Sequence, residues 1–141
     1  MIRSVAIALF ITTVISVSAQ TDTSAVAIGN RLPVYNLYYD ADEFYIPASG
    51  YATLDSVVAL MKADQNLKVI VTGYTDSTGS SGDNFTLSRR RAERVAEYIR
   101  GSGISASRVV VLYMGEIYAQ KGENNSNRHV ELILKMSSSP K

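Results

Sequence analysis

Charged side chains mark the two ends of a loop that otherwise consists mainly of Gly, Ser and Thr. Asp76 lies near its start, and three consecutive arginines, Arg89 to Arg91, follow in the segment after it. A carboxylate can bind an ammonium group, and a guanidinium can hold a carboxylate through two parallel hydrogen bonds. A helix start between them would add unpaired amides that favour an anion. Together these groups predict a pocket for a zwitterion, although an Asp in such a turn more often caps its own backbone.

A helix over residues 84–100 must position the arginines. Asn84 is the predicted N-cap, because its side chain can accept a hydrogen bond from the first free amides. Arg90 and Arg94 point away from the apolar face and are interpreted as solvated, whereas Arg89 and Arg91 lie on its two flanks. Periodicity alone does not choose between Arg89 and Arg91. The apolar face is predicted to consist of Phe85, Ala92, Val95, Ala96 and Ile99.

The remaining elements predict an α+β fold. Apolar residues at helical spacing indicate a helix over 51–62, and runs rich in β-branched and aromatic residues indicate strands. The predicted order is β-α-β-α-β-β, a two-layer sandwich with a mixed sheet and both helices on one face. The predicted strands cover residues 34–39, 67–74, 108–114 and 129–136.

The N-terminal segment is predicted to be a signal peptide. Arg3 precedes an apolar run, and Val17-Ser18-Ala19 provides small residues at the spacing of a cleavage site. The apolar run is shorter than the ~20 residues of a membrane-spanning helix, although an uncleaved anchor is the alternative. The chain is thus divided into a signal peptide (1–19), a linker (20–33), one domain (34–136) and a flexible tail (137–141). We expect no membrane span after cleavage.

Composition argues against several functions. The chain has no Cys and one His, which makes a zinc site improbable, and we expect no metal and no cofactor. His129 lacks an adjacent nucleophile, so no catalytic residue is predicted and the protein is not expected to be an enzyme. The balance of 14 basic and 13 acidic residues argues against nucleic acid as a partner. The acidic segment Asp40–Glu43 lacks the Gly and distal Glu of a calcium loop and is interpreted as a solvated turn, with a position at the pocket entrance as the alternative.

A family resemblance covers the stretch from Thr72 to Val109 and extends more weakly over residues 34–134. The segment TGYTDSTGSSGDNFTLSRRRAERVAEYIRGSGISASRV resembles the OmpA-like peptidoglycan-binding domain, whose pattern combines a strand ending in G-H-T-D with N-x-x-L-S-x-x-R-A-x-x-V. Further on, NRHVEL resembles the N-R-R-V-E of that family. The matched positions include Gly73, Thr75, Asp76, Gly79, Asn84, Leu87, Ser88, Arg91, Ala92, Val95, Gly103, Ile104 and Arg108.

The resemblance implies non-covalent binding of peptidoglycan through the meso-diaminopimelate residue of its stem peptide, to tether or sense the cell wall. The family's Asp falls on Asp76 and its helix-start Arg on Arg91, which resolves the choice that periodicity left open. The second family Arg falls on Arg128. Departures from the family pattern at Tyr74, Tyr113 and His129, together with a shorter loop before Asn127, imply an altered rim. The expected ligand-binding residues are Asp76, Arg91, Asn84, Thr75, Leu87 and Arg128.

The resemblance also implies a location in the periplasm or cell envelope of a Gram-negative bacterium. Other envelope proteins are further expected partners, and the altered rim supports an alternative hypothesis, a protein-interaction module that has lost its ligand. A small cell-wall hydrolase is a third hypothesis, weakened by the missing nucleophile–base pair.

Overall fold

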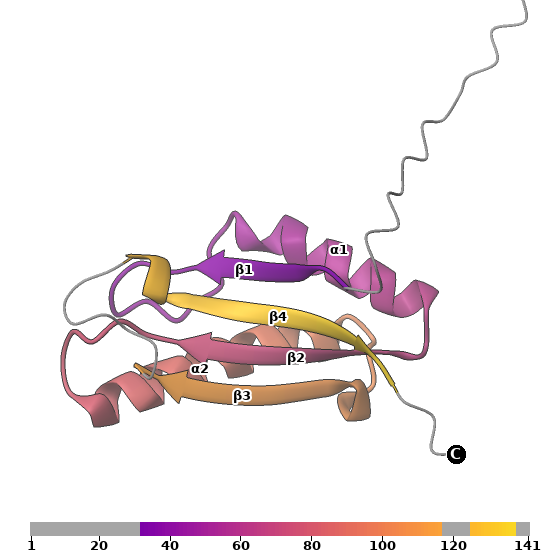
Figure 1. Cartoon of the computed structure of the whole chain (residues 1–141). Helices are drawn as coiled ribbons and strands as arrows, with labels where there is room; N and C mark the ends of the chain where they lie inside the picture. The colour runs from indigo at the N-terminus through magenta and orange to yellow at the C-terminus, as the bar shows by residue number, and fades with distance from the viewer. Residues whose placement is uncertain (1–31, 117–124, 138–141) are drawn as a thin grey trace, which may run out of the picture. The chain divides into compact units, whose positions relative to one another are not determined.

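The computed structural model describes residues 32–116 and 125–137 (Figure 1). The predicted signal peptide, most of the predicted linker and the last four residues of the predicted tail lie outside these ranges, and those assignments stay predictions. Two helices, two short 3-10 turns and four strands follow one another along the chain. They are β1 (Val34–Tyr38), α1 (Gly50–Ala63), β2 (Leu67–Tyr74), α2 (Ser81–Gly101), η1 (Ala106–Arg108), β3 (Val109–Gly115), η2 (Asn125–Asn127) and β4 (His129–Met136).

The strands form one mixed sheet in the order β1-β4-β2-β3. The C-terminal strand β4 lies between β1 and β2 and pairs antiparallel with both. Strand β3 pairs parallel with β2, and helix α2 forms the connection between these two strands. This arrangement places the ends of β2 and β3 and the start of β4 at one end of the sheet, where the functional residues were predicted.

Both helices cover the same face of the sheet, behind it in the view of Figure 1. Leu54, Val57 and Met61 of α1 are completely buried, and so are Val95 and Ile99 of α2. These side chains recur at helical spacing, and they pack on alternate residues of β2 and β4, which is why one helix stripe and one sheet face suffice for a core. The predicted α+β fold with this order of elements is therefore confirmed.

Two details of helix α2 differ from the prediction. The helix begins at Ser81, and its N-cap is Ser80, whose hydroxyl accepts a hydrogen bond from the Asp83 amide at 3.1 Å. Asn84 is thus in the first turn and not the cap, because the capping signal lies four residues earlier in the polar segment. Phe85, predicted to be in the core, is 49% exposed and packs edge-to-face on Tyr113 of β3, with ring centroids 5.1 Å apart.

None of the helices in the described residues covers the opposite face of the sheet (Figure 1). The strand register aligns Val34, Ile133, Ile70 and Val110 in one row across all four strands. Nearby, the His129 ring lies between the rings of Tyr38 and Tyr74, at centroid distances of 5.9 and 4.7 Å. In the ranges that the structure describes, no helix is both long enough and apolar enough to cross a membrane.

Arg108 fastens the C-terminal end of α1 to the sheet. Its guanidinium donates hydrogen bonds to the backbone carbonyls of Met61, Asp64 and Leu67 at 2.6 to 2.8 Å. A helix end leaves its last carbonyls unpaired, and a cation there also interacts favourably with the helix dipole. The match of Arg108 to the family pattern is therefore explained by its structural hydrogen bonds and needs no contact with a ligand.

Candidate functional site

Close backbone contacts fix the end of β2 against helix α2. A Cβ atom at Gly73 would lie 2.1 Å from the carbonyl oxygen of Ser88, so only glycine allows this approach. The Ser88 hydroxyl accepts a hydrogen bond from the Gly115 amide at 3.0 Å, and the Gly115 carbonyl accepts one from Thr75 at 2.9 Å. The start of the polar loop is thus held between α2 and the end of β3.

Asp76 forms a buried ion pair with Arg128. Its Oδ2 lies 2.8 Å from the Arg128 Nη1, and only 6–7% of either side chain is exposed. Asp76 Oδ1 also accepts a hydrogen bond from the Thr78 amide at 3.3 Å, as expected for an Asp that caps its own turn. Arg128 itself donates to the Tyr39 carbonyl at 3.3 Å. The two residues, 52 positions apart, are brought together because β4 enters the middle of the sheet beside β2.

Arg91 lies in α2, one turn after Ser88, and is completely buried. Its guanidinium donates to the backbone carbonyls of Glu43, Asp40 and Tyr74 at 2.7, 3.0 and 3.1 Å. It also lies over the ring of Tyr39, with 4.9 Å between the guanidinium carbon and the ring centroid. A guanidinium has five N–H donors, so two of them have no hydrogen bond to any residue in the described ranges.

Burial makes the charge of Arg91 costly. Removal from water lowers the pKa of its guanidinium to about 10, and the nearby charge of Arg128 acts in the same direction. The carboxylates of Asp76 and Asp42 oppose this change. Arg91 therefore stays protonated at neutral pH, but beside a second buried cation. Among the described residues, two buried guanidinium groups share one buried carboxylate, Asp76.

A depression of about 420 Å³ opens next to these buried charges. Asn84 and Leu87 line it, and they lie on the same stripe of α2 as Arg91, seven and four positions before it. The Asn84 side chain donates a hydrogen bond to Glu116 at 2.8 Å. The complete lining of the depression consists of Asp42, Phe44, Thr78, Gly79, Asp83, Asn84, Thr86, Leu87 and Arg90.

The six residues predicted to bind a ligand therefore fall into two groups. Asn84 and Leu87 line the depression, whereas Thr75, Asp76, Arg91 and Arg128 are buried close to it. The hydroxyl of Thr75 is buried without a hydrogen-bond partner in the part of the chain that the structure describes. Such a group is costly in a folded protein and is more common at functional sites than elsewhere.

Arg89 does not take part in this arrangement. Its side chain is 54% exposed and pairs with Glu93 at 3.4 Å on the outer surface of the helix. Of the two flanking arginines, Arg91 is therefore the one that is buried near Asp76 and Arg128.

Asp42 lines the depression, as one interpretation of the acidic segment expected, whereas Phe44 was not predicted from the sequence. Asp42 and Phe44 belong to the loop between β1 and α1, the same loop whose carbonyls bind Arg91. The sequence gives one signal, the acidic segment that contains Asp42, and this residue has the left-handed backbone angle φ = 58°, uncommon for a residue other than glycine. Arg90, expected to be solvated, is exposed but lies over the Phe44 ring at 5.2 Å.

The helix start itself is less suited to an anion than predicted. Ser80 already accepts a hydrogen bond from the first turn, and the carboxylate of Asp83 lies beside it. The negative charge of Asp83 interacts favourably with the helix dipole and would repel a second anion at this helix start. A ligand carboxylate therefore has a better partner in the buried guanidinium groups than in the helix amides.

Comparison with known proteins identifies the family to which the chain belongs. The sequence model of the OmpA family matches residues 38–131. The peptidoglycan-binding protein ArfA of Mycobacterium tuberculosis is 34% identical over 94 residues, covering 63% of this chain and 28% of that protein. A peptidoglycan-associated lipoprotein of Pasteurella multocida is 34% identical over 83 residues, covering 58% of this chain and 55% of that protein. The chain thus spans roughly a quarter to a half of the length of these relatives.

Solved structures share the fold. A peptidoglycan-associated lipoprotein from Burkholderia pseudomallei superposes with a TM-score of 0.67 at 22% identity, covering 71% of this chain and 89% of that chain. The periplasmic domain of MotB from Helicobacter pylori superposes with a TM-score of 0.63 at 16% identity, covering 77% and 79% respectively.

Proposed function

Because the chain belongs to the OmpA family, we propose that it binds peptidoglycan non-covalently, through the diaminopimelate residue of the stem peptide. The observation that carries the proposal is the burial of the Arg91 guanidinium. Arg91 is completely buried, and its hydrogen-bond acceptors in the described ranges are three neutral backbone carbonyls. A buried cation that contacts neutral acceptors is unfavourable, so this site favours a ligand that brings a carboxylate.

The free end of diaminopimelate carries an ammonium and a carboxylate on one carbon atom. The carboxylate takes the two N–H donors of Arg91 that have no partner in the described structure, and the ammonium approaches Asp76. Arg128 keeps Asp76 ionised and oriented, and the Thr75 hydroxyl gains a hydrogen-bond partner. The aliphatic part of the ligand lies along Leu87 and Asn84. Access to Arg91 requires the loop carbonyls of residues 40 and 43 to move.

Calorimetric titration of the purified protein with free meso-diaminopimelate tests this arrangement. Amidation of both ligand carboxylates removes the partner of the guanidinium and is expected to weaken binding at least tenfold, about 1.4 kcal/mol. Arg91→Lys is the matched variant, because it keeps the positive charge and removes the bidentate geometry. We expect it to bind the free ligand at least tenfold more weakly as well. Equal affinity for the free and the amidated ligand would refute the role of Arg91.

The relatives whose names describe peptidoglycan binding or association support a role in the cell envelope and not in catalysis. We propose that the protein is exported by a cleaved signal peptide, acts in the envelope of a Gram-negative bacterium and performs no chemistry on the cell wall. N-terminal sequencing of the protein from an envelope fraction should begin at Gln20. An assay for released muropeptides should detect no product after incubation with intact sacculi.

A protein-interaction function is the second candidate, and the uncovered face of the sheet favours it. The row of Val34, Ile70, Val110 and Ile133 presents apolar side chains on a face without a helix, and Val34 and Val110 are 51% and 42% exposed. Co-sedimentation with purified sacculi separates the two candidates. Retention of the protein by sacculi, and its release by free diaminopimelate, would favour the ligand. Failure to sediment would leave the interaction module as the better explanation.

A further inference from the structure

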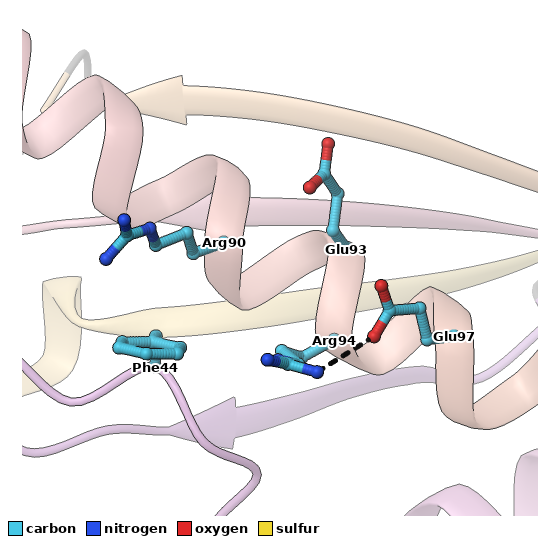
Figure 2. A pocket seen from close by; sticks show the side chains of 5 residues that line it. All are labelled: Phe44, Arg90, Glu93, Arg94 and Glu97. Carbon is cyan, nitrogen blue, oxygen red and sulfur yellow. Dashed lines mark hydrogen bonds and ion pairs between the residues drawn. The ribbon is translucent and has the colours of Figure 1, made fainter.

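A second depression, of about 320 Å³, continues from the first along the outer side of α2. Phe44 and Arg90 line both depressions, so these two residues form the boundary between them. Glu93, Arg94 and Glu97 complete the second one (Figure 2). In Figure 2, Arg90 and Arg94 extend toward the loop that bears Phe44, whereas Glu93 points away from it.

Aromatic rings hold both arginines in place. Arg90 lies over Phe44 at 5.2 Å, Arg94 lies over Tyr45 at 5.7 Å, and the two rings stack with centroids 4.5 Å apart. A guanidinium that rests on a ring keeps its N–H donors in the guanidinium plane, where a carboxylate can accept two of them. The side chain also loses less freedom on binding, because the ring already orients it.

Of the two arginines that line the second depression, one has no ion-pair partner in the described ranges. Glu93 pairs with Arg89 at 3.4 Å, and Glu97 pairs with Arg94 at 3.2 Å. Arg90 has no ion pair or hydrogen bond with any residue in the described ranges, although it is the arginine that both depressions share. The acidic residues that would repel an anion are therefore neutralised, and Arg90 remains available for one.

We propose that Arg90 binds a second carboxylate of the same peptide ligand, the α-carboxylate of the glutamyl residue that precedes diaminopimelate in the stem. This inference rests on the proposed function. The aliphatic chain of diaminopimelate separates its free end from the glutamyl residue, and that chain is placed along Leu87 in the depression that Arg90 also lines. A peptide whose free end lies at Arg91 thus extends past Leu87 toward Arg90. Phe44 orients the guanidinium and covers the apolar part of that residue.

The test compares three ligands by calorimetric titration of the purified protein. They are free meso-diaminopimelate, the tripeptide L-alanyl-γ-D-glutamyl-meso-diaminopimelate, and the same tripeptide with the glutamyl α-carboxylate amidated. Hydrogen bonds to charged groups contribute about 1.5 kcal/mol or more. We therefore expect the unmodified protein to bind the tripeptide about tenfold more tightly than its amidated form.

Arg90→Gln should abolish this preference, so that the two tripeptides bind equally. Arg89→Gln removes the same charge one position away on the outer surface and should preserve the preference. A preference that survives in Arg90→Gln, or that is absent from the unmodified protein while diaminopimelate still binds, would overturn the inference and leave the proposed function standing. Equal losses for all three ligands would also overturn it. If the unmodified protein binds none of the three, both proposals are wrong.

Discussion

Replacement of Asp76 by Ala provides the sharpest test of the buried charges. Asp76 is the one buried carboxylate in the described ranges, and its loss removes the buried ion-pair partner of Arg128. Removing one partner of a buried ion pair typically costs about 3–5 kcal/mol, because the remaining charge stays uncompensated. Domains of this size have free energies of unfolding of about 5–15 kcal/mol. The variant should therefore lose between a fifth and most of its stability.

A matched double variant separates the ion pair from simple loss of packing. Replacing Asp76 by Ala and Arg128 by Met together removes both charges and keeps an unbranched apolar side chain at the second position. Buried pairs replaced by apolar residues are often neutral in stability. The double variant should therefore be more stable than Asp76→Ala alone, with a coupling energy of at least about 2 kcal/mol.

Urea unfolding followed by circular dichroism measures these differences. A lower midpoint at an unchanged m-value reports a change in stability and not in the extent of unfolding. If Asp76→Ala costs less than about 1 kcal/mol, the pair behaves like an exposed one and its burial is not energetically important. If the double variant is as unstable as the sum of the single variants, the charges do not interact and the reasoning fails.

Three further predictions concern single side chains. Arg108→Ala should lower the free energy of unfolding by about 2–3 kcal/mol in the same urea titration, since it leaves helix-end carbonyls unpaired, and it should not alter sedimentation with sacculi. Tyr39→Phe should be neutral or stabilising by up to about 1 kcal/mol, because the Tyr39 hydroxyl is buried without a partner in the described ranges and burial raises its pKa. For His129, burial lowers the pKa, outweighing the opposite effect of Glu131. The unfolded chain therefore binds a proton at His129 more readily than the folded chain does. The free energy of unfolding should thus keep its full value above about pH 6.5 and should decrease as the pH falls below it. In unfolding measured from pH 5 to 8, His129→Phe should show a weaker dependence on pH.

Regular elements could be predicted from the sequence because each buries one continuous stripe. The strands over 67–74 and 129–136 coincide with β2 and β4, and the helix predicted over 51–62 lies within α1. Helix α2 was predicted to start three residues late, because its first turn contains only Ser, Gly and Asp and provides no apolar periodicity. Ser80 followed three residues later by Asp83 was the available capping signal.

Long-range contacts could not be predicted from spacing. The pairing of Asp76 with Arg128 depends on the insertion of β4 between β1 and β2, which no local pattern specifies. Periodicity placed Arg91 on the edge of the helix face but did not predict its burial. The loop between β1 and α1 buries it, and that loop lies almost 50 residues earlier in the chain. Residue types therefore indicated the chemistry of the site, whereas its accessibility depends on the fold.

The contacts of Arg91 determine how a ligand would compete for it. Its three acceptors are neutral backbone carbonyls, two of them from the loop between β1 and α1. A carboxylate on the two remaining N–H donors of Arg91 forms stronger, charge-assisted hydrogen bonds than a carbonyl does, so its binding offsets an exchange of the loop carbonyls for water. The carbonyls released by that exchange regain water, because residues 40 and 43 have exposed side chains and belong to a surface loop.

The cost of opening is thus limited to rearranging the loop between β1 and α1. The contact of Phe44 with the Arg90 guanidinium restrains that same loop against α2. A single movement of the loop consequently controls access to Arg91 and the position of Arg90, which links the two carboxylate sites that we propose.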